Sequence, residues 1–206
     1  MKDISQYLPL VAILRGVKPD EVCAVAQCLI DEGFGMIEVP LNSPNPFESI
    51  RNLSEQYGDK YLIGAGTVLS VADVENVAKA GGQLVVSPNT NAQVIKAAKA
   101  KSMMVLPGCL TPTEAFTALE AGADGLKFFP ASSMNLSLFK GLKAVLPTDT
   151  LMYAVGGVDH TNMADYFAVG INGIGLGSSL YKAGKSLVEI QKSAQLSVSA
   201  LQRLME

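Results

Sequence analysis

The sequence holds few of the residues that build metal sites or disulfide frameworks. Among its 206 residues there is one histidine, His160, and there are three cysteines, at positions 23, 28 and 109. An odd number of cysteines without Cys-x-x-Cys spacing does not indicate a disulfide framework, and one histidine gives little support to a zinc site. We therefore expect neither a disulfide nor a bound metal ion.

A basic tract, a long apolar run and a leader-like N-terminus are missing as well. Sixteen Lys and Arg residues against nineteen Asp and Glu leave a net charge of -3, so no cluster of cations is available to neutralise a row of phosphates. The apolar runs end well before the roughly 20 residues that a membrane span needs. Residues 1–7 are partly polar and acidic and Pro9 follows them, unlike a signal peptide. We expect a cytoplasmic protein that binds neither nucleic acid nor a membrane.

Apolar residues are plentiful, and they follow a repeating pattern. Hydrophobic residues make up 49% of the chain, which is enough for one large core. Short β-branched segments alternate with longer segments of helical period along the whole chain. Eight strands are predicted, at residues 11–15, 36–39, 61–65, 84–87, 103–106, 125–129, 151–155 and 173–176. Eight such units in one domain, residues 1–206, favour a closed (β/α)8 TIM barrel, with a doubly wound open sheet as the alternative.

Several of the intervening helices have clear start and stop signals. The range 70–80 begins with Ser70 as an N-cap and ends before Gly81. Thr111 precedes a proline and, three residues on, a glutamate, which is the pattern of a capping box. Residues 186–206 have apolar positions at helical spacing and are predicted to form the last helix.

Three charged residues lie at or near the ends of predicted strands. They are Arg15, Glu38 and Lys127, and a charge in a buried parallel strand costs several kcal/mol unless it is paired or used. If Leu126 and Phe128 face the helices, alternation turns Lys127 toward the barrel axis. One interpretation is a structural ion cluster in which Glu38 bridges the two cations. The other is a catalytic site.

As a catalytic group, Lys127 would act as a nucleophile that forms an imine with a carbonyl. A lysine attacks only when it is neutral, and the apolar walls expected from Phe128 and Phe129, with Arg15 nearby, would lower its pKa. A carboxylate would oppose that shift, so the direction stays open at this stage. Glu38 is the strand-end acid placed to move protons, and we assign it general acid and base work.

Two glycine turns follow the last two predicted strands. Gly156 and Gly157 follow one, and Gly177 and Ser178 follow the other. Such turns can present backbone N–H groups to a phosphate, assisted by a short helix expected near Ser178, or they can simply connect strand to helix. Thr67, after the third strand, either contacts a substrate carboxylate or caps the next helix.

The order of several short motifs resembles a known family across nearly the whole chain. The motifs are Leu14-Arg15-Gly16, Glu38-Val39-Pro40-Leu41-Asn42-Ser43, Gly64-Ala65-Gly66-Thr67-Val68-Leu69, Ser87-Pro88-Asn89, Pro107-Gly108, Leu126-Lys127-Phe128-Phe129-Pro130 and Val155-Gly156-Gly157. Their order resembles the 2-keto-3-deoxy-6-phosphogluconate and -galactonate aldolases. The resemblance implies a metal-independent class I aldolase, without a cofactor, that cleaves a six-carbon phosphorylated keto-deoxy sugar acid into pyruvate and glyceraldehyde 3-phosphate.

The resemblance also implies roles for individual residues. It places the Schiff-base lysine at Lys127 and the acid/base glutamate at Glu38, which agrees with the choice made from the residues alone. It implies that Arg15 and Thr67 contact the pyruvate-derived end of the substrate. It assigns the phosphate to a set of four residues, which are Gly156, Gly157, Gly177 and Ser178. It further implies a homotrimer.

Two departures indicate the branch of the family. The gluconate branch is expected to have Arg-Thr after the glutamate strand and a threonine before the paired glycines, whereas this chain has Asn42-Ser43 and Val155. These differences resemble the galactonate branch. In physical terms, a valine in place of a threonine at position 155 removes a hydrogen-bond partner for one epimer of the substrate. The alternatives are the gluconate aldolase, a phosphosugar epimerase or isomerase with Glu38 as base, and a barrel that binds a metabolite without turnover.

Overall fold

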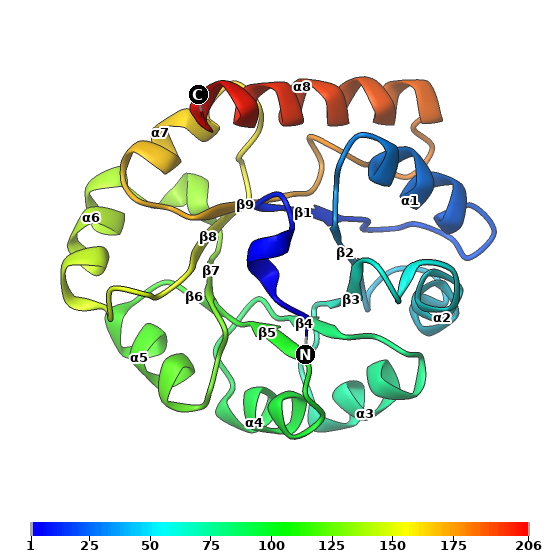
Figure 1. The fold of residues 1–206 in the computed structure, drawn as a ribbon. Helices are drawn as coiled ribbons and strands as arrows, with labels where there is room; N and C mark the ends of the chain where they lie inside the picture. The colour runs from blue at the N-terminus through cyan, green and yellow to red at the C-terminus, as the bar shows by residue number, and fades with distance from the viewer. Residues whose placement is uncertain (1, 206) are drawn as a thin grey trace.

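Parallel strands alternate with helices throughout residues 2–205, the part of the chain that the computed structural model describes (Figure 1). The strands are β1 Leu10–Ile13, β2 Met36–Pro40, β3 Leu62–Gly66, β4 Leu84–Val86, β5 Met104–Leu106, β6 Gly108–Cys109, β7 Leu126–Phe128, β8 Met152–Val155 and β9 Gly173–Leu176. The α-helices are α1 Val22–Asp31, α2 Pro46–Tyr57, α3 Val71–Lys79, α4 Ala92–Ala100, α5 Pro112–Glu120, α6 Leu136–Val145, α7 Met163–Ala168 and α8 Leu187–Met205, with short 3-10 helices η1 Ile4–Gln6 and η2 Ala131–Ser133. The helices surround the strands.

The strand order confirms the predicted TIM barrel. Consecutive strands pair in parallel from β1 to β5 and from β6 to β9, and β1 lies between β2 and β9, so the first and last strands of the chain are neighbours. A doubly wound open sheet would instead reverse its order at one point. The alternative fold is therefore wrong.

The count of eight strands needs a correction at the fifth position. The expected strand at residues 103–106 is followed by a second short strand, and Pro107 alone separates β5 from β6. β5 pairs with β4, whereas β6 pairs with β7, and the Pro107 carbonyl accepts a hydrogen bond of 2.9 Å from the Lys127 N–H. Proline has no N–H and interrupts the strand-to-strand hydrogen bonds, so the chain pairs with β4 before Pro107 and with β7 after it. The continuous chain from β5 to β6 therefore closes the ring of strands.

Local capping signals are found where the sequence predicts them. Ser70 and Asp73 form a reciprocal capping box at the start of α3, and Thr111 and Glu114 form another at the start of α5. Each box satisfies N–H groups that a helix start leaves without partners. The last helix, expected at residues 186–206, is α8. None of the helices in residues 2–205 combines the length and the apolar composition that a membrane span requires.

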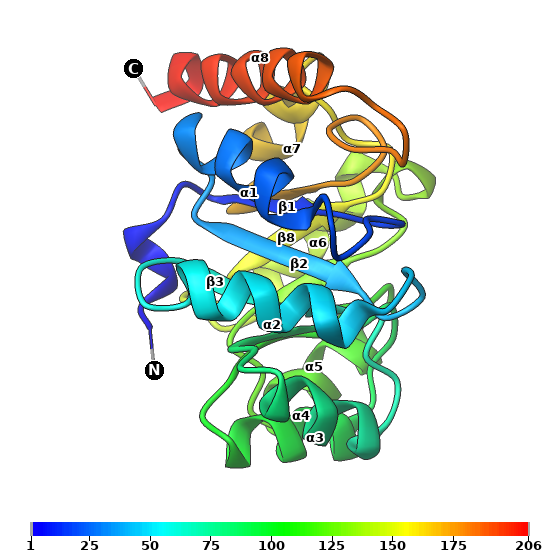
Figure 2. The same ribbon diagram turned by 90° about the vertical axis from the view of Figure 1, so that its right-hand side faces the viewer.

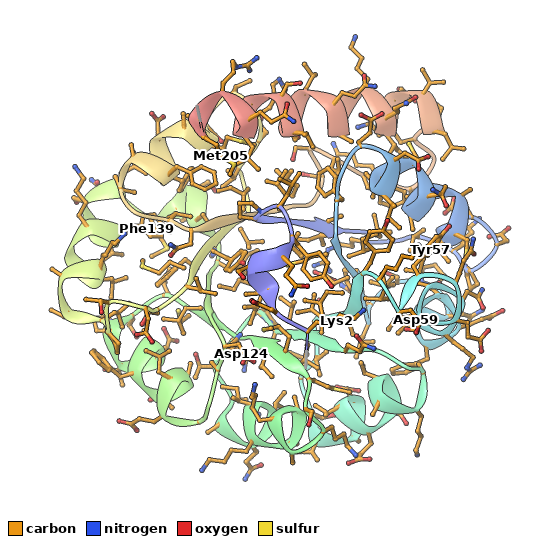
Figure 3. The ribbon with its side chains drawn as sticks, viewed as in Figure 1. Lys2, Tyr57, Asp59, Asp124, Phe139 and Met205 are labelled. Carbon is orange, nitrogen blue, oxygen red and sulfur yellow. The ribbon has the colours of Figure 1, made fainter. Side chains whose placement is uncertain are left out.

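The N-terminal segment covers the end of the barrel where the strands begin. η1 lies across the centre of the ring in Figure 1, and Figure 2 shows β2 pointing away from this end. Lys2 Nζ, labelled in Figure 3, donates to the backbone carbonyls of Gly58 and, at 2.6 Å, Tyr61. A Cβ on Gly35 would lie 2.3 Å from a ring carbon of Tyr7, so this aromatic ring packs directly on the chain entering β2. The end of the barrel where the strands finish is not covered by this segment, and the candidate functional site lies there.

Candidate active site

Glu38 and Lys127 point into the barrel and are both almost fully buried. Their exposed fractions are 1% and 6%, and they line one small internal cavity among apolar side chains. Ile37 and Val39, on either side of Glu38, belong to the core between strands and helices. Side-chain alternation along a strand therefore directs Glu38, and likewise Lys127, toward the barrel axis, as predicted.

The Glu38 carboxylate occupies space that exists because residue 66 is a glycine. A Cβ on Gly66, at the end of the neighbouring strand β3, would lie 2.0 Å from Glu38 Oε2. Oε2 is buried and has no hydrogen-bond partner among the described residues. Burial raises the pKa of Glu38 to about 7, although the positive charges of Lys127 and Arg15 and a hydrogen bond from the Gly66 backbone oppose the shift. A carboxyl group of this pKa can both take and return a proton near neutral pH.

Lys127 lies in surroundings that favour the neutral amine. Its Nζ is 4.8 Å from the centre of the Phe129 ring. Burial lowers the pKa of Lys127, Arg15 lowers it further, and Glu38 acts in the opposite direction. The sequence left this balance open, and in the structure the lowering prevails because the amine has little access to water.

Phe128 and Phe129 were both predicted to form apolar walls around Lys127, and the prediction is wrong for Phe128. Phe128 faces the helices and packs edge-on against Phe139 of α6, with ring centroids 5.5 Å apart and an interplanar angle of 88°. Figure 3 shows Phe139 on α6, outside the ring of strands. Phe129 is the aromatic wall of the lysine, because it lies beyond the end of β7, where the regular alternation no longer applies.

The interpretation of the charged residues as a structural ion cluster does not fit the structure. Within residues 2–205, neither Glu38 nor Lys127 forms an ion pair within 4.0 Å. The ion pairs that do form lie elsewhere, for example Lys99 with Asp124 at 2.6 Å. Glu38 and Lys127 thus influence each other through space without a direct salt bridge.

Arg15 lies beyond the strand that was expected to carry it. β1 ends at Ile13, and the chain turns at Gly16 with φ +87°. The Arg15 side chain is exposed, and its Nη1 donates a hydrogen bond of 2.6 Å to Asn42 Oδ1. The expected inward position is therefore wrong, but the side chain still lines the main cavity.

The main cavity opens at the end of the barrel where the strands finish. It has a volume of about 900 Å³ and includes Lys127. Eight of the nine predicted site residues line it: Arg15, Thr67, Lys127, Val155, Gly156, Gly157, Gly177 and Ser178. The ninth, Glu38, lines the small internal cavity, which shares four lining residues with the main one, namely Ile13, Lys127, Val155 and Gly175. The structure thus brings all the predicted residues to one place.

The two glycine turns form open backbone on one side of this cavity. Gly156 and Gly157 have φ of +93° and +74°, which favour glycine, and a Cβ on Gly157 would lie 2.4 Å from Ser132 Cβ. A Cβ on Gly177 would meet nothing within 4 Å. Within residues 2–205, the N–H groups of Gly157 and Ser178 donate to no other protein group. They are free to bind an anion.

The prediction of a short helix beginning near Ser178 is wrong. The chain makes a single turn there, closed by hydrogen bonds of 2.9 Å from the N–H groups of Leu180 and Tyr181 to the Gly177 carbonyl. Regular helix resumes only at Leu187. A helix dipole is therefore not available to an anion at this turn, and the groups that could donate to one are individual backbone N–H and hydroxyl groups.

Thr67 does not cap the helix that follows it. Ser70 is the N-cap of α3, so that alternative is wrong. Thr67 has φ +56°, a left-handed conformation that is unusual for a β-branched residue, and it lines the main cavity. Such strain costs about 1–3 kcal/mol and is typical of residues held in place for function.

Two charged residues of the cavity were missed by the sequence argument. Asp159 and Lys182 line it, a few residues after the two glycine turns. Hydrogen bonds from Thr161 lower the pKa of Asp159 and hold its carboxylate. Both are ordinary loop residues in the sequence, so only their position after the glycine turns could have indicated them. No group of three or more His, Cys, Asp or Glu residues in the described chain is arranged to hold a metal.

Comparison with known proteins places this geometry in context. The model of a family described as KDPG and KHG aldolase matches residues 1–197. The 2-dehydro-3-deoxy-6-phosphogalactonate aldolase of Escherichia coli (strain K12) is 51% identical over 193 residues, covering 94% of each chain. A solved structure described as "Native KDPGal structure" is 49% identical, covers 96% of each chain and has a TM-score of 0.95. The 2-dehydro-3-deoxy-phosphogluconate aldolase of Treponema pallidum (strain Nichols) is 31% identical over 163 residues, covering 79% of this chain and 76% of that protein.

Proposed function

Because the chain belongs to the KDPG and KHG aldolase family, we propose that Lys127 and Glu38 carry out its chemistry as the Schiff-base lysine and the acid/base catalyst. The protein is a carbon–carbon lyase that cleaves 2-dehydro-3-deoxy-6-phospho-D-galactonate to pyruvate and D-glyceraldehyde 3-phosphate. The observation that carries the residue assignment is the position of a buried lysine and a buried glutamate on the barrel axis, without an ion pair between them.

The reaction begins at the Lys127 amine. In its neutral form, which burial favours, Nζ adds to the C2 carbonyl of the substrate. Loss of one water leaves an imine, and the protonated imine nitrogen attracts electrons. The adduct therefore weakens the C3–C4 bond of the sugar acid.

Glu38 then moves the protons. Its carboxylate accepts the proton of the C4 hydroxyl, the C3–C4 bond breaks, and the electron pair of that bond moves toward the nitrogen to form an enamine. D-Glyceraldehyde 3-phosphate leaves. The Glu38 carboxyl group returns its proton to C3, and water hydrolyses the imine, which releases pyruvate and restores the amine. A pKa of about 7 suits a group with both tasks.

The rest of the cavity binds the two ends of the substrate. Arg15 and Thr67 are proposed to hold the carboxylate, near Lys127. The phosphate is proposed to lie on the glycine turns, with donors from Gly157 and the Ser178 backbone and hydroxyl. A volume of about 900 Å³ accommodates a six-carbon phosphorylated acid.

Reductive trapping tests the imine directly. Incubation with pyruvate and sodium borohydride, followed by peptide mass mapping, is expected to show a reduced pyruvate adduct on Lys127. An unmodified Lys127 in folded protein would instead favour an epimerase or isomerase that uses Glu38 as its base.

Replacing Gly66 by alanine is expected to lower kcat about 100-fold, because displacement of a catalytic group by about 1 Å costs this much. The added Cβ would lie 2.0 Å from Glu38 Oε2 and would force the carboxylate aside. The measurement is kcat for cleavage, together with the melting temperature of the variant.

Gly141→Ala is the matched control, because an added Cβ there meets nothing within 4 Å. It is expected to leave kcat unchanged. If Gly66→Ala folds and keeps kcat within about twofold of the wild type, the proposed position of Glu38 in catalysis is wrong.

The preference for the galactonate epimer is proposed to involve Val155, at the end of β8 on the wall of both cavities. Val155→Thr keeps the shape of the side chain and adds a hydroxyl. We expect kcat/KM for the gluconate epimer to rise about tenfold relative to the galactonate epimer, the value of about one hydrogen bond. Both epimers are assayed with pyruvate as the common product.

Val145→Thr makes the same substitution at an exposed position on α6 and serves as the control. An unchanged epimer ratio in Val155→Thr would show that Val155 does not determine specificity. It would not contradict the proposed cleavage reaction.

Two further features are proposed from the family alone. The resemblance supports a homotrimeric assembly, and sedimentation velocity of the purified protein would test it. A cytoplasmic location likewise stays a prediction, as does the expectation that neither nucleic acid nor a membrane is a partner.

A further inference from the structure

Two hydrogen bonds join the loop after β1 to the loop after β2. Arg15 Nη1 donates to Asn42 Oδ1 at 2.6 Å, and the Gly16 N–H donates to Ser43 Oγ at 2.9 Å. One bond fixes a side chain and the other fixes the backbone beside it. The two contacts join the loop that carries Arg15 to the loop that follows β2, the strand that carries Glu38.

The Asn42 side of this contact is rigid. The Leu41 N–H donates to the Gly66 carbonyl at 2.8 Å, so the chain stays attached to β3 just beyond β2. The Ser43 N–H donates to the Pro40 carbonyl at 2.9 Å, and Ser43 is buried. Asn42 therefore extends from a short turn that cannot shift without disturbing the strands around Glu38.

The backbone of the Arg15 loop is held at a second point. Buried Tyr181, in the loop after β9, donates its hydroxyl to Glu21 Oε1 at 3.1 Å, and the same oxygen accepts the Lys18 backbone N–H at 3.0 Å. A Cβ on Gly16 would lie 3.6 Å from Ala183 Cβ, so the two loops are also in close contact there. With its backbone fixed from two sides, Arg15 retains freedom mainly in its long, exposed side chain.

We propose that Asn42 is a positioning residue that holds the Arg15 guanidinium over the cavity for the substrate carboxylate. A guanidinium has five N–H donors, and the bond to Asn42 uses one, which leaves a pair for a bidentate contact with a carboxylate. An amide oxygen is suited to this task because it orients the cation without neutralising its charge. This inference rests on the proposed function, in which Arg15 binds the carboxylate.

A double-mutant cycle tests the inference. Asn42→Ala is expected to raise KM for the sugar acid about threefold to tenfold and to leave kcat within about twofold, because it weakens binding without touching the reacting atoms. Arg15→Ala is expected to raise KM about 30-fold or more. If Asn42 acts through Arg15, the double variant has the KM of Arg15→Ala alone.

Asn52→Ala is the matched control. Asn52 Nδ2 also donates to the Arg15 loop, at the Pro19 carbonyl 3.3 Å away, whereas the hydrogen bond of Arg15 Nη1 goes to Asn42. Its removal is expected to leave KM unchanged. Melting temperatures of all variants identify any general loss of structure.

Each other outcome overturns the inference in a recognisable way. Independent effects of the two substitutions, with their KM increases multiplying in the double variant, would show that Asn42 acts without Arg15. An unchanged KM in Asn42→Ala would show that the hydrogen bond orients nothing. An unchanged KM in Arg15→Ala, with trapping on Lys127 intact, would remove Arg15 from carboxylate binding but keep the aldolase chemistry. A wild-type protein that neither cleaves the sugar acid nor traps pyruvate would overturn the proposed function itself.

Discussion

Replacement of Lys127 by alanine is expected to lower kcat for cleavage by about 10,000-fold or more, because the variant has no amine with which to form an imine. Lys127 is the lysine of the described chain that lines both the main cavity and the small cavity beside Glu38. Lys182 also lines the main cavity, but it is exposed and does not line the small cavity beside Glu38. The residual rate should then approach that of a site that only binds its substrate. Steady-state cleavage assays measure the loss, and borohydride trapping with pyruvate should give no adduct.

A loss of activity in Lys127→Ala must be distinguished from a loss of folded protein. Burial of an amine opposes folding whenever the amine is charged, so its removal need not destabilise the protein, although alanine leaves a cavity. Lys127→Met fills the same space without an amine and should be equally inactive. Lys140→Ala, on the exposed face of α6, is the control and should keep full activity. Activity within about tenfold of the wild type in both Lys127 variants would contradict the imine mechanism.

Much of the fold could be predicted because its signals are local. The capping boxes at Ser70 and Thr111 lie within four residues of chain, and the structure has both. The break at Pro107 could not be predicted in the same way. Proline marks a possible interruption, but the exchange of partners from β4 to β7 depends on strands far away in the sequence. Local residues predict where an element starts more readily than which neighbour it pairs with.

The candidate site shows the same division. Glu38 and Lys127 stand out because a charge inside an apolar strand is costly, and this signal is contained in a few adjacent residues. The space for Glu38 is different, because it depends on Gly66 in the next strand, where a Cβ would lie 2.0 Å from the carboxylate. Arg15 leaves its predicted strand because Gly16 turns the chain, and Asn42 then holds it. Such contacts between loops have no pattern in the sequence.

Glu38→Gln is expected to lower kcat about 100-fold to 10,000-fold, the usual contribution of a general acid/base. The amide has nearly the shape of the carboxyl group but neither accepts nor returns a proton in the reaction. Imine formation on Lys127 should continue, so borohydride should still trap pyruvate on the variant. Loss of turnover with retention of the adduct would separate the role of Glu38 from that of Lys127.

The pH dependence gives this prediction a second, independent measurement. With a pKa of about 7, raised by burial from 4.5, Glu38 is mostly protonated below neutral pH and cannot accept a proton. The rate at which the wild type exchanges the methyl protons of pyruvate in D2O, followed by NMR, should therefore rise with pH through about 7. Pyruvate carries no phosphate, so its own titration does not interfere. The lowered pKa of Lys127 adds a further dependence, and Glu38→Gln is expected to lower that pKa again, because the charge of Glu38 opposes the lowering in the wild type. If Glu38→Gln keeps the step near pH 7, or exchanges protons within about tenfold of the wild-type rate, another group moves the protons.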